Sequence, residues 1–97
     1  METVNALDES MTGRWLVTTQ GSQHIWDLDA KTYQRLPGIS SNKFDCDSEI
    51  VKITRVEIWP QVGHVSFLWF DDPEFPEGLE HWRQSSTIVS IERIVEE

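Results

Sequence analysis

The sequence is poor in cysteine and has no long apolar segment. Cys46 is the only cysteine among the 97 residues, which excludes a disulfide within the chain. No run approaches the roughly 18 apolar residues that a membrane-spanning helix needs, and no charged-then-apolar leader is recognisable at the start of the sequence. These absences predict a soluble, cytoplasmic protein that does not bind a membrane.

Basic residues are also scarce. Eight Lys and Arg residues stand against seventeen Asp and Glu residues, which gives a formal net charge of −9. This surplus opposes nonspecific attraction to nucleic acid and to anionic lipid, so nucleic acid is not an expected partner. The acidity has two interpretations: it keeps the domain soluble, or it forms a surface that engages a basic protein or imitates nucleic acid.

Aromatic side chains, in contrast, are abundant. Five Trp, four Phe and one Tyr are present, and large aromatic side chains each bury about 150–250 Å². A chain of this length supports one core and therefore one domain, predicted over residues 14–97. Residues 1–13 are polar without apolar periodicity, and we expect them to form a flexible N-terminal arm.

The densest apolar segment, residues 50–70, predicts a β-hairpin. Its first half is rich in β-branched residues, and its alternation changes phase at Thr54 and Arg55, which predicts a β-bulge there. From Phe67 onward both faces are apolar, which indicates either a covered central strand or an exposed binding face. Pro60 and Gly63 favour a connection of about four or five residues.

Shorter segments separated by turn signals predict the other strands. A three-stranded meander is expected at residues 14–19, 23–28 and 32–36, and a closing strand at residues 86–95. Between them, residues 39–49 predict a surface loop that Phe44 attaches to the core. Residues 79–83 fit either one helical turn or the start of a strand.

Six or seven short strands predict an all-β fold, a small antiparallel partly open barrel or sandwich. The alternative is an α+β fold with one short helix on an antiparallel sheet, because residues 2–11 and 74–83 could each hold a turn or two. In the closing strand, Val89, Ile91 and Val95 should share one side. The apolar faces of the strands predict the following core residues: Trp15, Val17, Ile53, Ile58, Phe67 and Val89.

One stretch carries a family resemblance. Between Trp15 and Gly38 the chain contains Gly21-Ser22, His24 and Asp27-Leu28-Asp29, followed by Thr32, Arg35 and Pro37. This stretch resembles small uncharacterised β proteins of actinobacteria and their phages, and the order of arginine, serine pair and strand after Trp82 is similar in general form. The resemblance implies a bacterial or phage origin and a cytoplasmic setting. It implies no activity, ligand or catalytic residue.

Patterns for metal binding and catalysis are lacking. The candidate zinc ligands His24, His64, His81 and Cys46 are spread along the chain, whereas structural zinc sites use closely spaced pairs. The acidic run 45–49 lacks the glycine and the distal glutamate of a calcium loop. No cofactor is therefore predicted.

The cysteine is a poor candidate nucleophile, because carboxylates flank it and nearby negative charge raises a thiol pKa. Motifs for a serine nucleophile, a phosphate-binding loop or a metalloprotease helix do not occur. We therefore predict that the protein is not an enzyme. The alternative is a small hydrolase or a metal-dependent enzyme.

The strongest candidate site lies where aromatic residues occur within an acidic segment that prolines and a glycine interrupt. Aromatic anchors surrounded by charge are typical of protein-binding surfaces, although Trp69 and Phe70 are also explained as core residues and Phe75 as an anchor for the loop. The predicted partner-binding residues are Asp71, Asp72, Glu74, Phe75, Glu77, His81 and Trp82. The predicted function is non-enzymatic protein–protein interaction as an accessory or structural module, with a nucleic-acid-mimicking inhibitor as an alternative.

Overall fold

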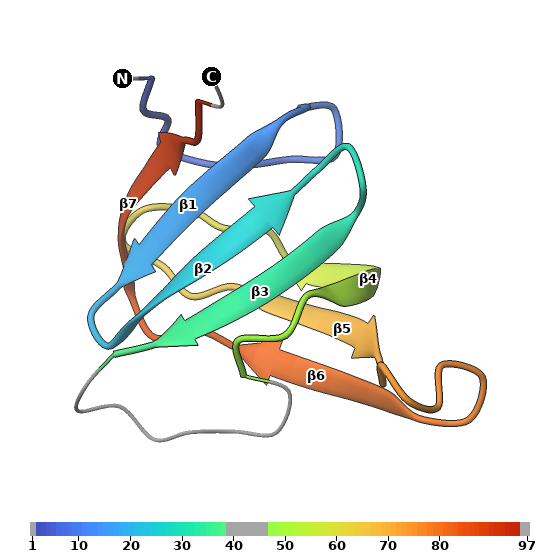
Figure 1. The fold of residues 1–97 in the computed structure, drawn as a ribbon. Helices are drawn as coiled ribbons and strands as arrows, with labels where there is room; N and C mark the ends of the chain where they lie inside the picture. The colour runs from blue at the N-terminus through green and yellow to red at the C-terminus, as the bar shows by residue number, and fades with distance from the viewer. Residues whose placement is uncertain (1, 39–46, 96–97) are drawn as a thin grey trace.

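The computed structural model describes residues 2–38 and 47–95, and it confirms the all-β prediction (Figure 1). No helix is present in the described residues, so the α+β alternative does not apply to them. The seven strands are β1 (Arg14–Thr19), β2 (Ser22–Asp27), β3 (Thr32–Pro37), β4 (Val51–Ile58), β5 (Phe67–Asp71), β6 (Glu80–Gln84) and β7 (Ile88–Arg93).

The strands form one antiparallel sheet in the order β6-β5-β4-β3-β2-β1-β7. The predicted meander is present as β1, β2 and β3, with bounds within one residue of those expected. β6 shows that residues 79–83 enter a strand rather than a helical turn. The predicted loop at residues 39–49, including Phe44, lies mostly outside the described residues.

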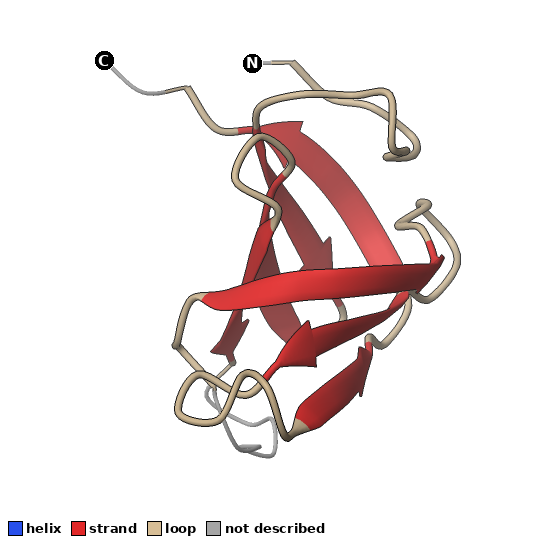
Figure 2. Ribbon diagram, turned by 90° about the vertical axis from the view of Figure 1, so that its right-hand side faces the viewer, coloured by secondary structure: helices blue, strands red, loops and turns tan. Residues whose placement is uncertain are grey.

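The sheet curls into a partly open barrel because the segment between β4 and β5 bonds to β7 (Figure 2). The Gly63 amide donates to the Ile88 carbonyl at 2.8 Å, and the Ile88 amide donates to the His64 carbonyl at 2.9 Å. Gly63 has a φ angle of 89°, which glycine adopts at little cost. The β4–β5 connection is therefore longer than expected, spanning residues 59–66, because part of it pairs with another strand instead of making a tight turn.

The N-terminal arm, which the sequence predicts to be flexible, is hydrogen-bonded to the barrel at several backbone positions. The Val4 amide donates to Ile91 in β7 at 3.1 Å, and the Leu7 amide donates to Pro60 at 2.9 Å. The Leu7 side chain is 2% exposed and belongs to the core. The arm therefore bridges β7 and the segment after β4, where the sheet alone leaves the barrel open.

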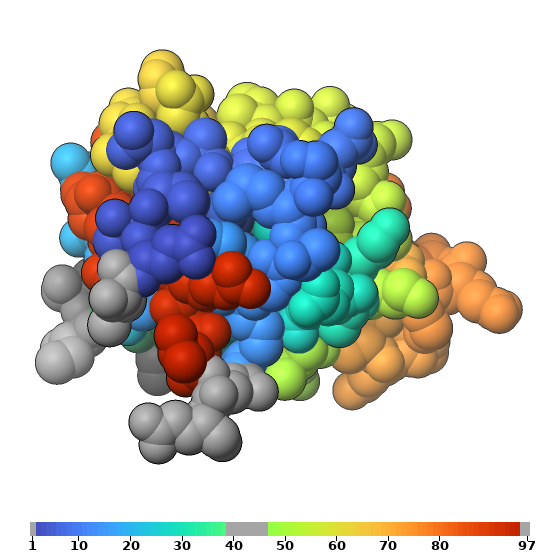
Figure 3. Space-filling view, turned by 90° about the horizontal axis from the view of Figure 1, so that it is seen from above, coloured from blue at the N-terminus to red at the C-terminus, as the bar shows by residue number. Residues whose placement is uncertain are grey.

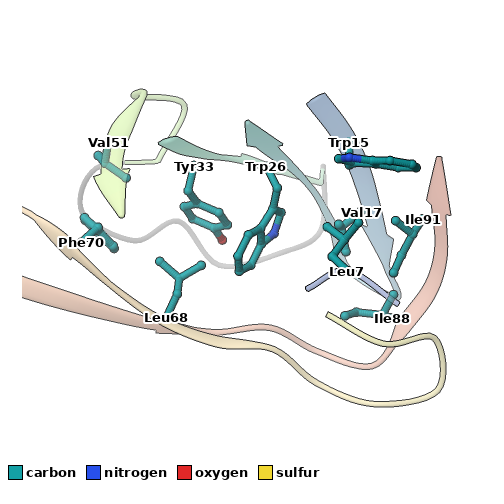
Figure 4. Packing of buried hydrophobic residues seen from close by; sticks show 10 residues of the cluster. All are labelled: Leu7, Trp15, Val17, Trp26, Tyr33, Val51, Leu68, Phe70, Ile88 and Ile91. Carbon is teal, nitrogen blue, oxygen red and sulfur yellow. The ribbon is translucent and has the colours of Figure 1, made fainter. Parts of the chain in front are cut away.

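The core is made of inward-facing residues from both halves of the sheet, together with Leu7 (Figure 4). Trp26 and Tyr33 point from β2 and β3 toward Leu68 of β5, and Tyr33 stacks on Phe70 at 6.4 Å. The buried apolar residues are Leu7, Trp15, Val17, Trp26, Tyr33, Val51, Leu68, Phe70, Ile88 and Ile91.

The predicted core is correct at Trp15 and Val17 and wrong at Ile58 and Val89, which are 47% and 52% exposed. Ile53 packs against the core while partly buried. The phase of each strand explains the errors. In β7 the pairing with β1 shifts by one residue, so Ile88 opposes Thr19 while Ser90 opposes Thr18, and Val89 between them faces solvent.

The prediction that Val89, Ile91 and Val95 share one side is also wrong, because Ile91 is buried whereas Val89 and Val95 are 52% and 73% exposed. In β4 the register shifts between Ile53 and Arg55, as the change of phase at Thr54 predicted, and shifts again before Ile58. The second irregularity places Ile58 opposite Phe67 on the outside of the sheet.

One set of buried polar side chains lies at the β2–β3 side of the interior. His24 is 2% exposed; its Nε2 lies 2.8 Å from the Ser22 hydroxyl and its Nδ1 lies 2.5 Å from the Tyr33 hydroxyl. Burial, with smaller contributions from the charges of Arg35 and Arg83, lowers the pKa of His24 to about 4. The imidazole is therefore neutral at pH 7, and both ring nitrogens have hydrogen-bond partners.

Candidate protein-binding surface

Strict alternation along β5 and β6 sends two sets of side chains to opposite faces. In β5, Leu68 and Phe70 are buried, while Phe67 and Trp69 between them face outward and are partly exposed. The β5–β6 register places Trp69 opposite Trp82, so these two side chains share the outer face. The outer face of β4, β5 and β6 therefore carries several large apolar groups.

These outward groups form a continuous row, which we call the aromatic face and define as Ile58, Phe67, Trp69 and Trp82. The rings of Phe67 and Trp82 are stacked with centroids 5.4 Å apart and planes 5° from parallel. Phe67 also meets Trp69 edge-on at 6.0 Å. Ile58 extends the row from β4, directly opposite Phe67.

The aromatic face remains accessible at both ends of this row. Trp82 is 54% exposed and Ile58 is 47% exposed. Each aromatic ring of the row lies on a strand and contacts a neighbouring ring, which restricts its motion. A rigid exposed row of large side chains is the kind of surface that a partner covers with little loss of side-chain entropy.

Charged side chains border the aromatic face on the β4 side. The Arg55 guanidinium lies over the Trp69 ring at 5.1 Å and pairs with Glu57 at 2.9 Å. The Trp69 indole N–H donates to the same Glu57 carboxylate at 3.3 Å. The Thr54 hydroxyl donates to Glu80 of β6 at 2.7 Å. The rim of the face is thus polar, as in protein interfaces generally.

The acidic loop, residues 72–79 between β5 and β6, is organised by Asp72. Its Oδ1 accepts from the backbone amides of Glu74 at 2.8 Å and Phe75 at 3.0 Å, and its Oδ2 lies 2.7 Å from His81 Nε2. The hydrogen bond to His81, followed by that of the Glu74 amide, lowers the pKa of Asp72 below its ordinary value. Asp72 is therefore a turn-forming residue as well as a negative charge.

The predicted binding residues divide into two groups. Asp72, Phe75 and His81 come together through the contacts of Asp72, and Phe75 is 62% exposed at the loop. His81, however, faces inward and stacks on Phe70 at 5.3 Å, whereas Trp82 faces outward. Adjacent strand residues point to opposite faces, so His81 and Trp82 do not share one patch.

The remaining predicted residues are carboxylates. Asp71 lies opposite Glu80 at the end of the β5–β6 ladder. It follows Trp69 by two residues in β5, so both side chains are on the outer face. Glu74 and Glu77 are exposed in the acidic loop. Asp71 and Glu80 therefore place negative charge next to Trp69 and Trp82, and the acidic loop adds exposed carboxylates beyond the ends of β5 and β6.

Phe67 and Ile58 are members of the surface that sequence reasoning assigned to the core. The available signal was the apolar character of both faces of β5, which permitted either a covered strand or an exposed face. The structure shows the exposed face, because β5 is covered by the core on one side and carries Phe67 and Trp69 on the other.

Comparisons of the chain with protein-family models, curated proteins and solved structures found no match. Within residues 2–38 and 47–95, no group of three or more His, Cys, Asp or Glu side chains lies close enough to hold a metal ion. The described part of the chain contains no helix and therefore none that could span a membrane.

Proposed function

We propose that the domain is a non-enzymatic interaction module that binds a protein partner through the aromatic face. The observation that carries this proposal is the stacked Phe67–Trp82 pair, which leaves Trp82 54% exposed on a regular strand. Trp is enriched among residues that dominate binding energy, and its burial by a partner would remove an apolar surface that water solvates poorly. The module serves as an accessory or structural subunit of a bacterial or phage assembly.

The proposed partner presents a basic surface. The chain has a net charge of −9, the carboxylates of Glu57 and Glu80 lie beside the aromatic face, and the acidic loop follows β5 directly. Complementary charge accelerates encounter and selects the partner, while the apolar centre holds the complex. This division assigns different kinetic roles to the rings and to the carboxylates.

The experiment is capture from an extract of the source cell with the purified chain as bait, followed by binding kinetics with the captured protein. Trp82→Ala should weaken binding at least about tenfold, mainly through faster dissociation, as for a central aromatic anchor. The matched control is Val89→Ala, which removes an exposed apolar side chain from β7. Equal affinity of the Trp82 and Val89 variants would overturn the proposal.

A double variant tests the charges. Glu74→Gln with Glu77→Gln should slow association and flatten its salt dependence while leaving dissociation nearly unchanged. Asp72 is kept in this variant because its carboxylate builds the turn. If the captured partner handles nucleic acid and nucleic acid competes for it, the domain acts as an acidic mimic. The Trp82 variant would then bind nearly as well as the natural chain.

A further inference from the structure

β3 and β4 separate soon after they meet. Within the described residues their pairing covers Thr32 with Lys52 and Tyr33 with Val51, and the Ile53 amide donates to the Lys31 carbonyl at 2.9 Å. Beyond Ile53, β4 pairs with β5 on its other side. A wedge therefore opens between the β2–β3 turn and the middle of β4.

The N-terminal arm forms the other wall of this wedge. In the view from above, the blue atoms of the first residues lie against the yellow-green atoms of β4 (Figure 3). Hydrogen bonds from Leu7 to Pro60 and from the Met11 amide to the Asp8 carbonyl, at 2.9 and 3.2 Å, hold this wall in place. The wedge is a groove of about 280 Å³ at the mouth of the barrel.

The floor and the rim of the groove differ in chemistry. Apolar side chains form much of the floor, and polar or charged side chains complete the lining. The apolar members are Met11, Leu28, Ile53, Val56 and Trp59, and the polar members are Asp8, Glu9, Lys31, Thr54 and Arg55.

The two sides of the rim are not equivalent. On the arm, Asp8 accepts hydrogen bonds from the Ser10 hydroxyl and, at 2.8 Å, from the Ser10 amide, and these bonds lower the pKa of Asp8. Asp8 therefore stays ionised, beside Glu9. On the β4 side, the Arg55 guanidinium already pairs with Glu57 at 2.9 Å. Because Glu57 pairs with Arg55, the two carboxylates of Asp8 and Glu9 outnumber the one remaining cation of the lining, Lys31.

We propose that this groove binds one long basic side chain, lysine or arginine, carried by an extended segment of a partner protein. Lys and Arg place their methylene stems on apolar surface while the charged end stays near water and carboxylates. The groove matches that division, with Val56 and Trp59 for the stem and Asp8 and Glu9 for the cation. Its volume lies just below the range of roughly 300–1,000 Å³ typical of small-molecule pockets, so it suits one side chain.

The inference rests on the proposed function in one respect, that the ligand is a protein segment, but it concerns a different site, which shares Thr54 and Arg55 with the rim of the aromatic face. The test uses blocked short peptides of alternating threonine and valine with one central residue varied: lysine, arginine, norleucine or glutamate. Binding is followed by NMR, through the amides of Asp8–Met11 and Ile53–Val56 and the indole N–H of Trp59. The Trp82→Ala chain should bind these peptides as well as the natural chain, which separates this test from that of the aromatic face.

The lysine and arginine peptides should shift these resonances and bind at least about fivefold more tightly than the norleucine peptide. Asp8→Asn with Glu9→Gln should remove that preference, whereas Glu74→Gln with Glu77→Gln, which removes the same charge elsewhere, should keep most of it. Lys31→Ala should tighten binding by removing a like charge from the rim. Shifts confined to other residues, equal binding of norleucine, preference for glutamate or absence of binding would each overturn the proposal.

Discussion

At the scale of single residues, the buried side chain of His24 makes the stability of the fold depend on pH. Its neutral ring bonds to Ser22 and Tyr33, and burial is the main cause that lowers its pKa to about 4 from an ordinary value of 6.5. Burial likewise raises the pKa of Tyr33, so the phenol keeps its proton and can donate to the imidazole. A charged imidazole would disrupt this arrangement.

The sign of the pH effect follows from the direction of this pKa. Below pH 6.5 the unfolded chain protonates His24 while the folded chain does not, so stability falls as pH falls toward 4. The loss from this residue should reach at most about 3 kcal/mol. Urea denaturation of the natural chain and of His24→Gln across this range measures it. A slope that is the same in both proteins would show that His24 does not contribute.

Phe67 and Leu68 are adjacent residues with different roles. Leu68 is 1% exposed, so Leu68→Ala should destabilise the fold by about 2–5 kcal/mol. Phe67 is partly exposed on the outer face, so Phe67→Ala should cost less than the roughly 3–5 kcal/mol of a fully buried phenylalanine while weakening partner binding. Denaturant midpoints of the two variants compare them directly. A larger loss of stability for Phe67→Ala than for Leu68→Ala would mean that Phe67 is a core residue.

At the scale of elements, the sequence predicts the strands correctly where alternation and turn residues agree. The β1–β3 meander combines regular alternation with turns near Gly21 and at residues 29–31, and the phase change at Thr54 marks a real bulge. The composition also singles out Trp82 and the acidic loop, which stay a predicted binding site. The sequence does not determine the orientation of His81, because residues 79–83 fit either a strand or a helical turn.

The misplaced residues show what local patterns leave undetermined. In residues 88–91, Ile-Val-Ser-Ile, both alternating sets contain an apolar residue, so the pattern does not say which set faces inward. The irregular pairing with β1 places Ile88 and Ile91, one from each set, in the interior. Leu7 is a single leucine in a polar segment, so no periodicity marks it. Its burial depends on the distant Pro60 and Ile91 segments, which the arm joins.

The arm should therefore contribute to stability as a structural element. Leu7→Ala should lower the free energy of unfolding by about 2–5 kcal/mol, because the side chain is 2% exposed within the core. Leu16→Ala, in contrast, changes a partly exposed residue of β1 and serves as the comparison. Thermal melts and hydrogen exchange at the Val4 and Leu7 amides report the result. Rapid exchange at both amides with no change in melting would mean that the arm is detached in solution.

At the scale of the whole molecule, charge is the dominant imbalance. Even if each of the eight basic residues paired with one carboxylate, nine of the seventeen carboxylates would remain unpaired (17 − 8 = 9). The Arg35–Asp47 pair is buried, with both side chains 8% exposed, so salt screens it little. The exposed carboxylates that remain repel one another in the folded state.

Added sodium chloride should therefore raise the melting temperature at neutral pH, since screening reduces repulsion more than it weakens the buried pair. Glu74→Gln with Glu77→Gln removes two exposed charges, so this variant should start from a higher melting temperature and gain less from salt. Calorimetry of both proteins over a salt series measures the difference. A melting temperature that falls with salt would mean that attractive charge pairs outweigh repulsion. The carboxylates of the acidic loop would then act in contacts within the fold and not in binding a partner.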